Sequence, residues 1–137
     1  MNVSDRGYRE IEHTADWELE VWGPDLAAVL EQSACGMFAL MGVTLSAGDR
    51  IVRELELDAG DAESLLVEFL GELLYLAESE GVAFDNMDLR VDGHRLSAQL
   101  QGAAVVSQSK EIKAVTYHRL EVIETDSGWQ TRIVFDV

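Results

Sequence analysis

The stretch Trp17-Glu18-Leu19-Glu20-Val21-Trp22 indicates the class of fold, because it alternates between the two sides of an extended chain. Its odd-numbered positions are all apolar, whereas two of its three even-numbered positions are glutamate. A period of two is typical of a β-strand that buries one of its sides. We therefore expect a sheet that is covered on one face and exposed to solvent on the other.

Two segments after this strand have helical periodicity. In residues 26–41 and again in residues 62–80, apolar side chains recur at intervals of three and four, which places them on one face of a helix. Gly42 and Gly81 follow these segments directly, and glycine is common just after the last residue of a helix. Gly36 lies inside the first segment, where glycine costs about 1 kcal/mol relative to alanine, so we expect a close packing contact there.

The remaining segments are strand-like and complete the prediction of the fold class. Asp92-Gly93 and Asp126-Ser127-Gly128 are typical of hairpin turns. The order β-β-α-β-α-β-β-β-β predicts an α+β fold: two layers, with a largely antiparallel or mixed β-sheet and two amphipathic helices on one face. Strands are expected over residues 8–13, 17–22, 51–57, 87–91, 96–100, 112–123 and 129–137.

Length and composition predict a single domain over residues 1–137. Cys35 is the one cysteine, which excludes an intramolecular disulfide, and its apolar helical context predicts a packed side chain rather than a nucleophile. Residues 1–9 contain no apolar signal region, and no apolar run approaches ~18 residues. We therefore expect a cytoplasmic protein without a membrane anchor.

The chain is strongly acidic, since 26 Asp and Glu against 10 Lys and Arg give a net charge of −16. Binding of RNA or DNA depends on cations that neutralise phosphates, so no direct nucleic-acid binding is expected. A basic protein partner or a bound cation fits this charge better. The alternative is that the charge serves solubility alone.

Three polar clusters carry side chains that could support chemistry. The first is Glu12-His13-Thr14-Ala15-Asp16, a connector that would place His13 and Asp16 at one end of the sheet. The second is Lys113-Ala114-Val115-Thr116-Tyr117-His118, where strict alternation places His118 on the more apolar face of a strand. A histidine at such a position is either a packed core residue or a functional one.

The third cluster is the end of the chain, Phe135-Asp136-Val137. The last predicted strand runs through to Val137, so the sheet would hold the Asp136 carboxylate beside the α-carboxylate. If Asp16 lies at the same end, three carboxylates converge, and oxygen donors without a soft ligand suit Ca²⁺ or Mg²⁺. Without that proximity, each of them is an ordinary surface carboxylate.

In their order along the chain, these clusters resemble the archease family, small proteins that assist the tRNA-splicing RNA ligase. The runs at residues 12–16 and 113–118 are specific for the family when they occur together, and the resemblance spans nearly the whole chain. The other matching positions are Tyr8, Gly23 before the first helix, Leu65-Leu66 and Leu73-Leu74-Tyr75 in the second helix, and the terminal Asp136-Val137.

The resemblance implies a non-enzymatic activator that promotes guanylylation of the ligase and its multiple turnover in tRNA splicing and RNA repair. It also implies a divalent-metal site for Ca²⁺ or Mg²⁺, formed by Asp16, Asp136 and Val137. The implied partner is a protein, the tRNA-splicing RNA ligase itself.

Three other motif positions, His13, Lys113 and His118, are assigned by the resemblance to shaping the site or docking the ligase. The chain departs from the family pattern at Trp17, where many relatives carry a smaller aliphatic residue, and in its strongly acidic balance. Neither departure affects the implied metal ligands.

Two other functions are open at this stage. The family has also been considered as a chaperone or modulator of RNA-modifying enzymes, such as a tRNA methyltransferase. A metal-dependent hydrolase would use the carboxylate cluster, but the sequence contains no activated nucleophile and no GxSxG, CxxC or HExxH motif. Multiple-turnover ligation with and without the protein separates these functions.

Overall fold

The computed structural model of this chain describes residues 5–11 and 17–137. Within these ranges the chain forms two helices, α1 (Leu26–Met41) and α2 (Ala62–Glu80), whose bounds are those predicted. The strands are β1 (Gly7–Ile11), β2 (Trp17–Gly23), β3 (Thr44–Leu45), β4 (Ile51–Asp58), β5 (Val82–Asp92), β6 (Arg95–Ser107), β7 (Ala114–Val115), β8 (Val122–Thr125) and β9 (Gly128–Asp136).

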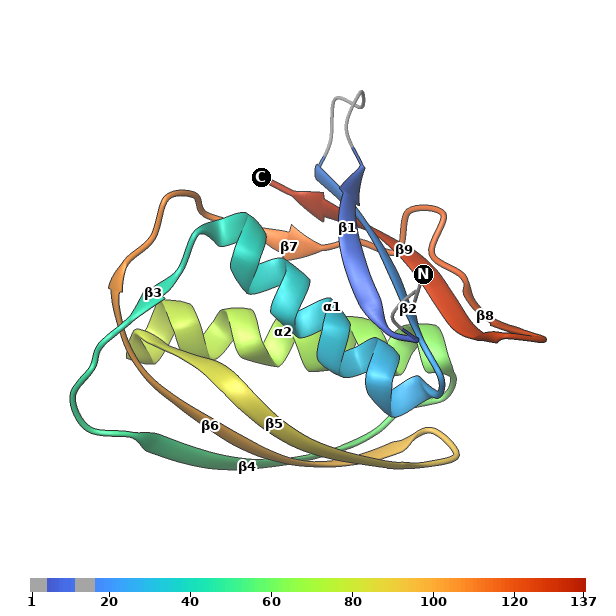
Figure 1. Ribbon diagram of the computed structural model, residues 1–137, viewed down its shortest axis with the longest axis horizontal. Coiled ribbons are helices and arrows are strands. Elements are labelled where there is room, and N and C mark those ends of the chain that lie inside the picture. Colours follow the sequence, from blue (N-terminus) through green and yellow to red (C-terminus); the bar gives the residue numbers. More distant parts are fainter. Residues whose placement is uncertain (1–4, 12–16) are drawn as a thin grey trace.

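The strands pair antiparallel and are divided between two sheets (Figure 1). A five-stranded sheet has the order β1-β2-β9-β7, with β8 also paired to β9. In the four-stranded sheet β6 pairs with β3, β4 and β5. Both helices contact strands of both sheets. The predicted α+β class and the antiparallel pairing are confirmed, and the helices join two sheets rather than covering one.

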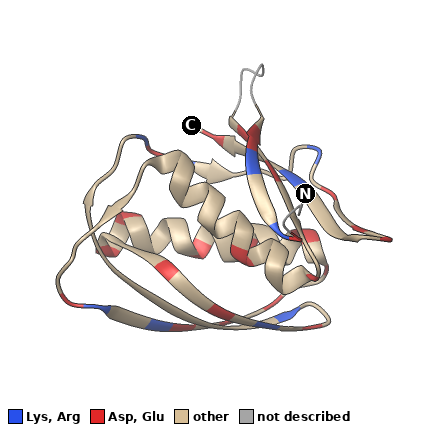
Figure 2. Cartoon of the chain, in the orientation of Figure 1, with Lys and Arg blue, Asp and Glu red and all other residues tan. Residues whose placement is uncertain are grey.

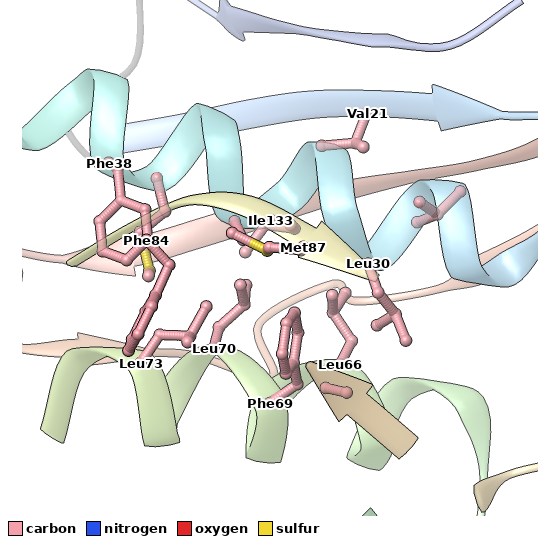
Figure 3. Close-up of a cluster of buried hydrophobic side chains, with 14 of the residues drawn as sticks. Val21, Leu30, Phe38, Leu66, Phe69, Leu70, Leu73, Phe84, Met87 and Ile133 are labelled. Atoms are coloured by element: carbon pink, nitrogen blue, oxygen red, sulfur yellow. The ribbon is translucent and has the colours of Figure 1, made fainter. Parts of the chain in front are cut away.

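A single cluster of buried apolar side chains connects the helices to the two sheets. In Figure 3, side chains from α1, α2, β5 and β9 point toward one another. The predicted inward side of β2 is confirmed, because Leu19 and Val21 are completely buried. Other fully buried members of the cluster are Leu30, Met37, Leu65, Leu66, Phe69, Leu70, Leu73, Leu96, Leu100 and Ile133.

The predicted packing contact at Gly36 is confirmed. A Cβ atom at this position would lie 2.5 Å from Leu19 Cδ2 and 2.9 Å from Tyr8 Cδ1. Because Gly36 has no side chain, α1 approaches β1 and β2 closely enough to bury Leu19. Close contact with the five-stranded sheet therefore offsets the low helix propensity of glycine.

Both helices begin at an aspartate cap and end at a glycine. Asp25 caps α1, and the Asp61 carboxylate caps α2 by accepting a hydrogen bond of 2.7 Å from the Ser64 N–H. That hydrogen bond lowers the pKa of Asp61 below its usual value. Gly42 and Gly81 have φ angles of 64° and 66°, the left-handed conformation that glycine adopts at low cost. Among the described residues, no helix is long and apolar enough to cross a membrane.

The prediction of one long strand over residues 112–123 was wrong. Only β7 and β8 form, and residues 116–121 leave the sheet between them. Thr116 is the point of departure, since its N–H and its hydroxyl both donate to the Val134 carbonyl, at 3.0 and 2.9 Å. The apolar alternation continues through the segment, so the pattern does not reveal where pairing with β9 stops.

A tight turn occupies the middle of this excursion. The Leu120 N–H donates to the Tyr117 carbonyl at 3.0 Å, and the His118 N–H donates to Thr116 Oγ1 at 3.2 Å. Arg119 has a φ angle of 54°, the one positive value among the described non-glycine residues. A positive φ at the third residue of a turn is normally supplied by glycine or asparagine.

The β5–β6 hairpin is longer than predicted. A bulge in β5 interrupts the alternation of apolar and polar residues, so the sequence pattern does not reveal the first part of this strand. The register shifts between Phe84 and Asn86, which leaves Asp85 as the extra residue. Gly102 on β6 lies opposite this bulge, and a Cβ atom there would be 1.8 Å from the Ala83 carbonyl oxygen. The absence of a side chain at Gly102 thus allows the bulged strand to pair with β6.

Gly102→Ala tests this requirement. The new methyl group would meet backbone atoms that cannot move without breaking the ladder, so the free energy of unfolding should fall by about 3 kcal/mol. Gly71→Ala is the matched control: a Cβ at Gly71 meets nothing within 4 Å, and the change should stabilise α2 by about 0.5–1 kcal/mol. Urea denaturation of both variants measures the two effects, and an unchanged Gly102→Ala midpoint would contradict the packing argument.

Candidate functional site

The end of the chain is held in the sheet by β7. The Lys113 N–H donates to the Asp136 carbonyl at 2.8 Å, and Ala114 is the register partner of Asp136. The Asp136 side chain is exposed, and Val137 is 38% exposed. Main-chain hydrogen bonds thus fix the position of this end, while its side-chain carboxylate faces solvent.

On the other side of β9, the start of β2 pairs with the end of the chain. Trp17 is paired with Phe135, the residue before Asp136. His13 and Asp16 lie outside the described residues, and the described chain resumes at Trp17. The convergence of Asp16 with Asp136 and Val137 therefore stays a prediction.

Lys113 and His118 are both exposed, but they occupy different positions relative to β9. Lys113 is next to Asp136 through its main-chain hydrogen bond, so the two predicted site residues are brought together. The placement of His118 on the apolar face of a strand was wrong, because the chain has already left the sheet at Thr116. This position excludes the interpretation of His118 as a packed core residue.

Lys110 is a candidate that the sequence patterns did not reveal. Its Nζ atom lies 4.3 Å from the centre of the Trp17 ring, a cation–π contact. The N–H groups of Ser109 and Lys110 both donate to the Met41 carbonyl at the end of α1, at 2.9 and 3.1 Å. These bonds hold residue 110 near Trp17, which pairs with the residue before Asp136. No local signal links positions 17 and 110, since the contact is purely tertiary.

The ligands predicted at this end are the Asp136 carboxylate and the α-carboxylate of Val137, oxygen donors that would suit a hard cation. No described cation lies within ion-pair distance of the Asp136 side chain. Within residues 5–11 and 17–137, no group of three His, Cys, Asp or Glu side chains is arranged to hold a metal ion. A complete site therefore requires a further donor, and Asp16 is the residue predicted to supply it.

Cys35 packs as the sequence predicts. It is partly buried on α1 and lines a small cavity of about 280 Å³ together with Phe38, Val43 and Phe84. Burial in this apolar environment raises the pKa of the Cys35 thiol, so the reactive thiolate is disfavoured at neutral pH. Cys35 thus has the character of a packing residue.

Residues 8–137 match the sequence profile of the Archease protein family (MTH1598/TM1083). This chain belongs to the archease family. It is 35% identical over 148 aligned positions to protein archease from Methanosarcina barkeri, and the alignment covers all of both chains. Protein archease from Thermococcus gammatolerans is 33% identical, with 96% of this chain and 99% of the relative covered.

Solved structures of the same family share the fold. A solution structure of protein 1598 from Methanobacterium thermoautotrophicum matches with a TM-score of 0.71 and 26% identity, over 96% of this chain and 99% of that one. A crystal structure of a Thermotoga maritima archease, described as a possible chaperone, matches with a TM-score of 0.71 and 25% identity, over 94% and 96%. The resemblance found in the sequence motifs is thereby confirmed.

The positive φ angle of Arg119 leads to a prediction about the stability of the protein. A left-handed conformation costs an arginine about 1 kcal/mol, whereas asparagine tolerates it. Arg119→Asn should therefore raise the free energy of unfolding by about 0.5–1 kcal/mol. Arg119→Gln removes the same charge but keeps the strain, so it should leave stability within about 0.5 kcal/mol of the wild type. Thermal and urea denaturation of the pair decide the point, and equal stability of the two variants would refute it.

Proposed function

We propose that this chain is a non-enzymatic activator of the tRNA-splicing RNA ligase, which it helps to become guanylylated and to turn over repeatedly. The observation that carries the proposal is the family match over residues 8–137, together with the motif residues of that family at both ends of the chain. The pairing of β7 with the end of β9 supports it, because it brings the motif residue Ala114 opposite the motif residue Asp136. β2 follows the 12–16 motif in the sequence and pairs with the same end of β9 through Trp17 and Phe135.

The proposed metal ligands are Asp16, Asp136 and the α-carboxylate of Val137. The pairing of Trp17 with Phe135 supports the proximity of the two aspartates. Asp16 is the residue before Trp17 in the sequence, and Asp136 is the residue after Phe135. A bound Ca²⁺ or Mg²⁺ would supply a concentrated positive charge at this end of an otherwise acidic protein. Lys113 and Lys110 would then shape the surroundings of the carboxylates, and His13 and His118 would contribute to docking.

The acidic surface supports a protein partner with a basic surface. Figure 2 shows Asp and Glu spread along β4, β5 and α2. An RNA ligase presents cationic side chains to its RNA, and an acidic protein can approach such a surface without binding RNA itself. Electrostatic attraction of this kind accelerates association and weakens as salt is added.

A second candidate function is that of a chaperone or modulator of RNA-modifying enzymes, such as a tRNA methyltransferase. The description of the Thermotoga maritima relative as a possible chaperone favours it. Both functions need a protein partner and no catalysis by this chain. Stimulation of a ligase at multiple turnover is specific to the first.

Asp136→Asn tests the proposed metal site. The substitution keeps the shape of the side chain and removes its charge, so stimulation of multiple-turnover ligation by the cognate ligase should fall by about tenfold or more while the fold is retained. Asp49→Asn, at an exposed aspartate in the loop before β4, is the control and should stimulate like the wild type. Full stimulation by Asp136→Asn would remove Asp136 from the site, and a wild type that never stimulates would remove the ligase function.

A C-terminal extension tests the role of Val137 separately. One or more residues appended after Val137 convert its carboxylate into an amide, which is a weaker ligand for a hard cation. Affinity for Ca²⁺, measured by isothermal titration calorimetry, should decrease about tenfold, since one of three charged donors is lost. Unchanged affinity with an unchanged circular dichroism spectrum would show that the terminal carboxylate is not a ligand.

A further inference from the structure

A groove of about 320 Å³ lies on the side of the five-stranded sheet that faces away from the helices. Glu20 and Arg132 are register partners on β2 and β9, and they alternate with buried residues such as Leu19 and Ile133. They therefore belong to the outer face. The residues that matter for the groove are Glu20, Arg119, Glu121, Ile123, Gln130 and Arg132.

The groove is balanced in charge, unlike the rest of the molecule. Arg9 Nη2 lies 2.6 Å from Glu20 Oε2, and Arg132 Nη1 lies 3.7 Å from Glu18 Oε2. Two arginines, Arg119 and Arg132, and two glutamates, Glu20 and Glu121, thus line a groove in a chain whose net charge is −16, and Arg9 and Glu18 lie beside it. In Figure 2 the basic segments of β1, β9 and the loop before β8 are found in the same part of the molecule. Acidic charge therefore does not dominate this face.

Arg119 is the unusual residue of the groove. It lies within ion-pair distance of no carboxylate among the described residues, although the chain contains 26 acidic residues. Its positive φ of 54° is a conformation that an arginine adopts only at an energetic cost. The Tyr117–Leu120 hydrogen bond holds the backbone of this turn, and the Arg119 side chain lines the groove. Strained backbone conformations cluster at ligand clamps and switch regions, which favours a binding role for Arg119.

We propose that this groove is a second docking surface for the protein partner, and that it takes a segment with an acidic side chain next to a basic one. The partner's carboxylate pairs with the guanidinium groups of Arg119 and Arg132, and its basic side chain pairs with Glu121. Ile123, which is 42% exposed, supplies an apolar contact between them. Nucleic acid fits less well, because two glutamates line the groove and would repel phosphates. The proposal rests on the proposed function for the identity of the partner, the tRNA-splicing ligase.

The test measures affinity of the full-length chain for the cognate ligase by surface plasmon resonance. Arg119→Gln and Arg132→Gln should each weaken binding by about tenfold, because a charge-assisted hydrogen bond is lost. Arg90→Gln, at an exposed arginine of the four-stranded sheet, is the matched control and should bind like the wild type. The difference between wild type and Arg119→Gln should shrink at high salt, which a purely structural effect would not do.

Arg119→Asn separates binding from stability, since it relieves the backbone strain and should still bind about tenfold more weakly. Wild-type affinity in Arg119→Gln and Arg132→Gln would overturn the docking surface and leave the ligase function intact. A wild type that binds no ligase would overturn both. Binding of a fluorescent single-stranded RNA to the wild type alone, lost in Arg119→Gln, would show that the groove holds phosphates and would also overturn the proposal.

Discussion

The antiparallel register of β9 is the constraint on which the site depends. β9 pairs with β2 along one side and with β8 and β7 along the other, and its inward residues Ile133 and Phe135 are almost completely buried. Because neighbouring side chains alternate between the faces of a strand, burial of Phe135 turns Asp136 toward solvent. A slip by one residue would move Asp136 to the core side and Phe135 out of it. The hydrophobic core thus sets the direction of the carboxylate that is proposed to bind metal.

The same register creates the groove on the outer face. Burial of Leu19 against α1 directs Glu20 outward, opposite Arg132. The close approach of α1 at Gly36 fixes which side of β2 is buried. It therefore also determines which charged groups of β2 lie on the opposite side of the sheet. One set of packing contacts positions both proposed interaction surfaces, because β2 and β9 contribute to each of them.

The helices could be predicted with their bounds because their signals are local. Apolar spacing and the glycines at positions 42 and 81 depend only on neighbouring residues, and the family motifs could likewise be recognised in the chain. The excursion at residues 116–121 could not be predicted, because it starts from the bonds between Thr116 and the Val134 carbonyl, 18 residues away in the sequence. A strand that pairs and a segment that has left the sheet can have the same alternation of apolar and polar residues.

The sequence by itself therefore determined the α+β class, both helices, the inward side of β2 and the motif residues that place the chain in the archease family. Tertiary structure alone decided which distant groups meet: Lys113 with Asp136, Lys110 with Trp17, and Arg119 with Arg132 at one groove. Side-chain periodicity follows from backbone geometry within a few residues. Contacts between strands depend instead on burial and hydrogen bonding across the whole fold. They therefore cannot be predicted from any single segment of the chain.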